Sequence, residues 1–118
     1  MFKLIVAGSR DFEDYAFLKQ RLEHLLQNVE GEIEIVSGRA RGADLLGERF
    51  AKEKGYKIAE FPANWERDGK VAGFLRNTDM AKYSNACVVF WKNKSRGSKH
   101  MIDQATKFNL KVRIYEVT

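Results

Sequence analysis

The sequence predicts an α/β fold: a single three-layer domain with a five-stranded, mostly parallel sheet and helices on both faces. Apolar runs typical of strands alternate with segments of helical periodicity in the order βαβαβαβαβ. The connections between these segments are short. Two of the runs, residues 4–7 and 86–91, are almost entirely apolar, as expected of strands that a parallel sheet buries on both faces.

The first half of the chain is expected to contain two strand–helix units. A strand at residues 3–8 precedes a helix from about Asp14 to Asn28, whose leucines recur at helical spacing and form one apolar stripe. A second strand, about Glu32–Val36, precedes a helix from about Ala43 to Lys54. Gly55 is expected to end that helix as a C-cap.

The second half continues the alternation. A loop with the only proline, residues 61–69, is expected between the third strand and the third helix. The remaining elements are a strand at about Lys57–Phe61, a helix from about Lys70 to Tyr83, a strand at Ala86–Trp91, a helix from about Ser98 to Phe108 and a strand at about Lys111–Tyr115.

Length and composition indicate one globular domain over residues 1–118. The apolar content of 44% and charged content of 31% are ordinary for such a domain. No apolar run approaches the ~18–20 residues that span a bilayer, and the N-terminal run is too short for a signal peptide. The single cysteine, Cys87, excludes an internal disulfide and is expected in the core. These features favour a cytoplasmic protein without membrane contact.

The positive charge is concentrated at one end of the chain. Residues 1–85 hold fourteen basic and fourteen acidic residues, whereas residues 86–118 hold seven basic and two acidic ones and so carry the whole net charge of +5. Such a surplus attracts an anionic ligand or nucleic acid, although a solvated basic face would explain it equally.

The turn at residues 37–44, Ser-Gly-Arg-Ala-Arg-Gly-Ala-Asp, joins the second predicted strand to the helix that follows. Helix N-termini present unpaired N–H groups and the positive end of the helix dipole, which suit phosphate. Gly38 and Gly42 permit a close approach to the backbone, while Arg39 and Arg41 supply cations. A tight turn alone would also explain the glycines, and the spacing matches neither the dinucleotide nor the P-loop pattern.

Ligands of open α/β sheets bind outside the carboxyl ends of the strands, and the unusual residues of this chain follow predicted strands. The residues expected to bind the ligand are Gly8, Ser9, Arg10, Ser37, Gly38, Arg41, Gly42, Ala43, Asp44, Trp65, Arg76, Asn77, Trp91, Ser95, Gly97 and Ser98. A structural role competes for several of them. Asp44 could cap its helix, Arg76 and Asn77 could form a solvated helix face, and either tryptophan could serve packing.

Several motifs together resemble the YspA/YpsA-related branch of the SLOG superfamily, over almost the whole chain. They are Gly8-Ser9-Arg10-Asp11, residues 37–44, Phe61-Pro62-Ala63-Asn64-Trp65, Gly69-Lys70-Val71-Ala72-Gly73, Arg76-Asn77 with Met80, and Phe90-Trp91 followed by Ser95-Arg96-Gly97-Ser98. The resemblance implies a Rossmann-like fold and a nucleotide-derived ligand. It also implies kinship with the lonely-guy phosphoribohydrolases and with DNA-processing protein A, and a homodimer.

Two positions depart from the related patterns. Arg39 replaces the second glycine of the family's Ser-Gly-Gly-Ala-Arg-Gly-Ala-Asp, where its side chain could crowd a phosphate or contact it. Met101 stands where the lonely-guy enzymes carry their catalytic glutamate, and Ser98 where they carry a threonine. Because a thioether cannot transfer a proton, the resemblance favours binding over that hydrolysis.

Three functions follow as hypotheses. The first is binding of a nucleotide or nucleotide-derived phosphate ligand, in sensing or sequestration, with the amides of Gly42-Ala43 and Gly97-Ser98 holding phosphate. The second is a hydrolase that cleaves an N-glycosidic or phosphoester bond, for which Asp11, Asp44 and Glu48 are candidate catalytic carboxylates. The third is a binder of single-stranded nucleic acid. No His/Cys pattern indicates a resident metal, and Mg²⁺ would arrive with phosphate.

Overall fold

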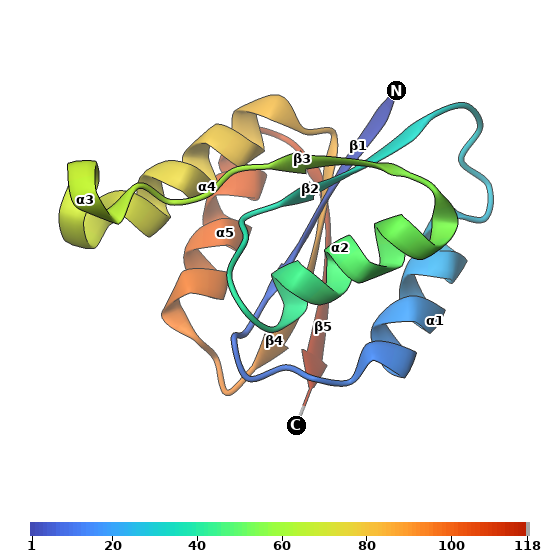
Figure 1. Cartoon of the computed structure of the whole chain (residues 1–118), viewed down its shortest axis with the longest axis horizontal. Helices are drawn as coiled ribbons and strands as arrows, with labels where there is room; N and C mark the ends of the chain where they lie inside the picture. Colours follow the sequence, from blue (N-terminus) through green and yellow to red (C-terminus); the bar gives the residue numbers. More distant parts are fainter. Residues whose placement is uncertain (118) are drawn as a thin grey trace.

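Five parallel strands form the centre of the computed structural model, which describes residues 1–117 (Figure 1). The strands lie in the order β3-β2-β1-β4-β5, and every neighbouring pair is parallel. Their bounds are Phe2–Gly8 (β1), Ile33–Ser37 (β2), Lys57–Glu60 (β3), Ala86–Lys92 (β4) and Lys111–Val117 (β5). The predicted α/β architecture is confirmed, and the sheet is wholly rather than mostly parallel.

Helices cover both faces of the sheet and make three layers (Figure 1). α1 (Tyr15–Leu26) and α2 (Ala43–Lys54) pack on one face, while α4 (Ala72–Tyr83) and α5 (Arg96–Lys107) pack on the other. The alternation of side chains along β1 explains why both faces are apolar. Leu4 and Val6 join the core beneath α1 and α2, whereas Ile5 and Ala7 join the core beneath α4 and α5.

The strand order reverses between β1 and β4. From β1 the chain moves outward through β2 to β3, then returns to the other side of β1 to form β4 and β5. The loops leaving β1 and β4 therefore diverge to opposite faces of the sheet, which opens a crevice at the carboxyl ends of these strands. This crevice holds the candidate site.

The segment predicted as a loop over residues 61–69 is partly helical. It contains α3 (Trp65–Asp68) and runs into a 3₁₀ turn, η1 (Gly69–Val71), before α4. The Asn64 side chain accepts a hydrogen bond of 3.0 Å from the Arg67 amide and so caps α3. α5 begins two residues before its predicted start.

Two local predictions are confirmed. Gly55 ends α2 in the left-handed conformation, with φ of 74°. Cys87 is buried in β4, and burial raises the pKa of its thiol to about 12, which leaves it an inert core residue. Within residues 1–117, none of the helices has both the length and the apolar character needed to cross a membrane.

Candidate functional site

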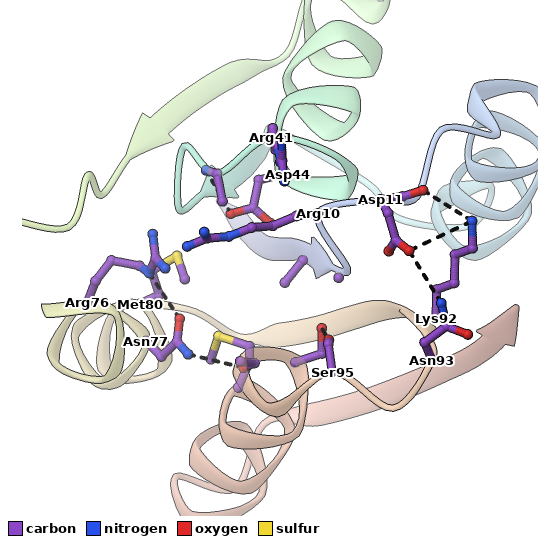
Figure 2. A pocket seen from close by; sticks show the side chains of 16 residues that line it. Arg10, Asp11, Arg41, Asp44, Arg76, Asn77, Met80, Lys92, Asn93 and Ser95 are labelled. Atoms are coloured by element: carbon purple, nitrogen blue, oxygen red, sulfur yellow. Dashed lines mark hydrogen bonds and ion pairs between the residues drawn. The ribbon is translucent and has the colours of Figure 1, made fainter. Parts of the chain in front are cut away.

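A pocket of about 370 Å³ lies in the crevice at the carboxyl ends of β1 and β4 (Figure 2). Figure 2 shows Arg10, Arg41 and Asp44 on one wall, Asn77 and Ser95 on the facing wall, and Asp11, Lys92 and Asn93 at one end. The lining residues are Ala7, Gly8, Arg10, Asp11, Ala40, Arg41, Asp44, Arg76, Asn77, Met80, Lys92, Asn93, Ser95, Gly97, Ser98 and Met101. The sequence-predicted ligand residues among them do converge on one space.

The pocket is electropositive. Its lining includes four basic side chains, of Arg10, Arg41, Arg76 and Lys92, and only two acidic ones. Arg10 and Arg41 are exposed, and within residues 1–117 neither guanidinium makes a hydrogen bond or an ion pair. Lys92 instead lies 4.0 Å from the Asp11 carboxylate at the rim. Two guanidinium groups are therefore free to meet an anion.

Asp44 is the buried carboxyl group of the pocket. It is only 5% exposed, and its Oδ2 accepts a hydrogen bond of 3.2 Å from the Ala40 amide. Burial raises the pKa of Asp44 to about 7, although the Ala40 hydrogen bond and the nearby Arg76 favour the charged form. A side chain of this kind can hold or release a proton near neutral pH. Its hydrogen bond comes from Ala40, ahead of α2, and not from an amide of the helix that it was expected to cap.

The N-terminus of α5 forms part of the pocket floor. Ser95, Gly97 and Ser98 line the pocket, and no acceptor within residues 1–117 receives the amide hydrogens of Gly97 or Ser98. A Cβ added at Gly97 would meet no atom within 4 Å, so the space beside this turn is open. Free amides at the positive end of a helix, beside an open space, suit a phosphate group.

The loop after β1 covers the turn that opens α2, contrary to the prediction that Gly42 and Ala43 hold phosphate through their amides. The Ala43 amide donates a hydrogen bond of 3.4 Å to the Ser9 carbonyl, and neither residue lines the pocket. Gly42 has φ of 83°, and a Cβ there would lie 2.3 Å from the Ser9 carbonyl oxygen. A glycine is therefore needed here because the Ser9 backbone passes close to it, and not because a ligand does.

Behind this turn, Glu48 accepts hydrogen bonds from both Ser37 and Arg39. Ser37 Oγ donates a hydrogen bond of 2.6 Å to Glu48, and Arg39 donates one of 2.5 Å to the same carboxylate. Glu48 is buried and does not line the pocket, so it is neither a solvated surface residue nor a group that borders the candidate site. Arg39 keeps a positive φ of 66° and directs its guanidinium to Glu48. The residue that departs from the family pattern thus neutralises a buried carboxylate.

Arg76 and Asn77 do not form the solvated helix face that the sequence alone favoured. The Arg76 guanidinium donates to the Gly38 carbonyl and to Asn77 Oδ1, the latter at 3.0 Å. Asn77 is buried, and its Nδ2 lies 3.4 Å from the Gly97 carbonyl oxygen and 3.1 Å from His100 Nδ1. Asn77 therefore connects α4 to the α5 turn and orients Arg76 across the pocket.

The predicted serines and tryptophans divide between structure and pocket. Ser9 is buried, and its hydroxyl bridges Lys92 and Ser95 at 2.8 and 3.1 Å. Ser95 Oγ donates in turn to Ser98 Oγ at 2.8 Å. The Trp91 indole donates to the Ser95 carbonyl at 3.0 Å and supports the α5 turn from behind. Trp65 is 52% exposed and lies outside this pocket.

Sequence reasoning missed part of the lining. Ala7, Met80 and Met101 provide buried apolar surface, and Lys92 and Asn93 close one end. Met101, which replaces the lonely-guy glutamate, therefore does border the pocket, but as a thioether. The position of Lys92 directly after an apolar strand was the available signal. No group of three metal-binding side chains occurs within residues 1–117.

Comparison with known proteins identifies the family. Residues 2–67 match the model of the family described as "YspA, cpYpsA-related SLOG family". The chain belongs to this family. Membership suggests binding or processing of a nucleotide-related molecule. "Gene 61 protein" of Mycobacterium phage D29 is 30% identical over 118 residues, covering 95% of this chain and 94% of the relative.

The fold also has a solved counterpart. The X-ray structure of DNA processing protein A (DprA) from Streptococcus pneumoniae superimposes with a TM-score of 0.75 over 97% of this chain, at 22% identity. This chain spans 50% of that one, so the likeness concerns one half of the larger protein. It establishes the Rossmann-like fold that the family resemblance implied.

Proposed function

We propose that this protein binds a nucleotide or nucleotide-derived phosphate ligand in the pocket between β1 and β4, in sensing or sequestration. One observation carries the proposal: the free amides of the α5 turn face a pocket in which basic side chains outnumber acidic ones four to two. A phosphate beside Gly97 and Ser98 would accept their amide hydrogens, and Arg10 and Arg41 would balance its charge.

The remainder of the lining suits the rest of a nucleotide. Ala7, Met80 and Met101 offer apolar contact to a sugar or base, and Asn93 offers an amide. Asp44, which takes up a proton near neutral pH, can either accept from a ribose hydroxyl or donate to a phosphate oxygen. Few polar groups on a partly apolar surface are typical of small-molecule sites.

The test is calorimetric titration of the purified protein with AMP, ADP, GMP and UMP. We expect at least one to bind, and Arg41→Ala to lower its affinity about tenfold, as befits the loss of one charge-assisted contact. Arg113→Ala is the matched control, because Arg113 is an exposed arginine of β5 outside the pocket. The proposal fails if no nucleotide binds, or if both variants weaken binding equally.

A hydrolase is the second candidate, and Asp44 is the observation that favours it. Of the three candidate carboxylates, Glu48 is engaged behind the turn and Asp11 lies at the exposed rim, whereas Asp44 is buried in the pocket wall. A carboxyl group with a pKa of about 7 can serve as general acid or base. Chromatography of nucleotides incubated with the protein would detect freed base or phosphate, and Asp44→Asn should abolish any such product.

A homodimer remains a prediction from the family, and α4 offers it a surface. Phe74 and Leu75 in the first turn of this helix, and Val71 just before it, are about half exposed. Light scattering coupled to size exclusion would test the dimer, with Phe74→Glu as the disrupting variant.

Single-stranded nucleic acid is the remaining hypothesis, and steeply salt-dependent binding of an oligonucleotide would favour it. Mg²⁺ is proposed only as an ion that would bind together with the phosphate of the ligand.

A further inference from the structure

A second hollow of about 370 Å³ adjoins the main pocket and was not expected from the sequence. Its nine lining residues are Arg10, Gly38, Arg39, Ala40, Arg41, Pro62, Ala63, Trp65 and Arg76, among which four are arginines and none is acidic. Arg39 is compensated by Glu48, but Arg10 and Arg41 have no anionic partner within residues 1–117. The hollow is therefore more strongly cationic than the main pocket.

The two hollows share one wall. Arg10, Ala40, Arg41 and Arg76 line both of them, so they meet along the arginine side chains rather than being separated by a layer of core. Arg76 uses Nη1 and Nε in hydrogen bonds to Gly38 and Asn77, and its Nη2 has no acceptor within residues 1–117. An anion placed at this shared wall would contact arginines from both sides.

Trp65 provides an aromatic surface at the far side of the second hollow. It lies on α3, at the outer edge of the molecule beyond α4 (Figure 1), and is 52% exposed. Gly73 lies beside it: a Cβ there would be in ordinary van der Waals contact with Trp65 Cη2, at 3.4 Å, and with Arg76 Nη2, at 3.5 Å. The Trp65 indole and the Arg76 guanidinium therefore both lie close to the Gly73 backbone. A planar ring can stack on such an indole.

We propose that the second hollow is a subsite for a second planar head, so that the ligand has two heads joined by a phosphate bridge. One head lies in the main pocket, the bridge lies along Arg10 and Arg76, and the second head stacks on Trp65. This inference rests on the proposed function and deepens it, since it specifies a two-headed ligand over a mononucleotide. Single-stranded nucleic acid shares this chemistry, and the test separates the two.

The experiment compares diadenosine pyrophosphate with ADP by calorimetric titration of the full chain. Both probes carry two phosphates, but only the first carries a second base. Stacking of one base contributes about 1–3 kcal/mol, so we expect diadenosine pyrophosphate to bind the wild type at least about tenfold more tightly than ADP. Trp65→Ala should remove this advantage while leaving ADP affinity within about twofold.

Two further variants keep the test decisive. Ala63→Glu places a carboxylate in the second hollow alone, and should likewise remove only the advantage of the two-headed probe. Ile114→Ala, which truncates an exposed apolar side chain of β5 that lines neither hollow, is the control and should change nothing.

Each contrary result has a distinct meaning. Equal affinity of both probes for the wild type overturns the two-headed ligand, and so does a Trp65→Ala variant that weakens both probes alike. Binding of an oligothymidylate that depends on Trp65, without any advantage of diadenosine pyrophosphate, overturns it in favour of nucleic acid. Failure of every nucleotide to bind overturns the proposed function itself as well.

Discussion

The turns that precede α2 and α5 look alike in sequence and differ in whether another segment of the chain covers them. Both follow a buried strand, contain serine, arginine and glycine, and open a helix of twelve residues. At α2 the Ser9 carbonyl receives the Ala43 amide, and the Asp44 carboxyl receives that of Ala40. At α5 the amides of Gly97 and Ser98 have no acceptor within residues 1–117.

The difference teaches that a glycine-rich turn before a helix is a binding site only if no other part of the protein occupies it. The loop after β1 passes over the α2 turn, as shown by the 2.3 Å that would separate a Gly42 Cβ from the Ser9 carbonyl oxygen. Within residues 1–117, by contrast, no atom lies within 4 Å of the position that a Gly97 Cβ would take. The α2 turn thus builds the wall of the pocket, and the α5 turn supplies its free donors.

The largest effect should come from exchanging each glycine for alanine. We expect Gly42→Ala to lower the free energy of unfolding by about 3 kcal/mol or more, because of its positive φ and the close Ser9 carbonyl. Gly97→Ala, the matched variant, should be neutral or stabilising by about 0.5–1 kcal/mol. Urea unfolding followed by circular dichroism measures both. Similar losses at the two positions would contradict the comparison.

Asp44→Asn should change how stability depends on pH. Burial raises the folded-state pKa of Asp44 to about 7, above its value in the unfolded chain, so the folded protein retains a proton that the unfolded chain releases. Wild-type stability should therefore fall as pH rises from about 4 to about 7, and level off above that range. We expect the decrease in the free energy of unfolding to be about 2 kcal/mol smaller in the variant than in the wild type.

Urea unfolding at about pH 5 and about pH 8 would measure this difference. Asp11→Asn is the control, because it removes an exposed carboxylate at the rim of the same pocket. An Asp44→Asn variant whose stability changes between the two pH values as much as that of the wild type would show that Asp44 does not retain its proton.

Gly97→Asp should separate the effect on ligand binding from the effect on folding at the turn that opens α5. The new side chain enters free space, and a carboxylate in the first turn of a helix stabilises by about 0.3–1 kcal/mol. It would also occupy the place proposed for the phosphate and repel that group, so we expect ADP affinity to fall at least about tenfold by calorimetry. Asn28→Asp adds the same charge to an exposed position outside the pocket and should leave affinity unchanged.

The smallest effect concerns the turn that precedes α2. Arg39→Gly restores the residue of the family pattern and relieves a positive φ, but leaves the buried Glu48 without its cation. The two contributions oppose each other, and we expect a net loss of about 1 kcal/mol in the free energy of unfolding. In a Glu48→Gln background the same change should be neutral or stabilising. An equal cost in both backgrounds would show that the ion pair contributes nothing.

The sequence by itself determined the sheet and the rim at which the polar residues gather. Alternation along β1 sends Leu4 and Val6 to one face and Ile5 and Ala7 to the other, and this pattern is local enough to be read without coordinates. Parallel strands bring their carboxyl ends together, which is why Gly8, Asp44 and Gly97 could be assigned to one edge of the sheet.

Only the tertiary structure decided which groups at that edge are free. Whether an amide has an acceptor depends on segments far apart in the chain, such as Ser9 over Ala43. For the same reason the Arg76 guanidinium meets the Gly38 carbonyl instead of forming a solvated face, and Trp65 borders a second hollow together with distant residues such as Arg10. Local propensity sets the elements, but hydrogen-bond satisfaction and close approach between distant segments are settled by packing.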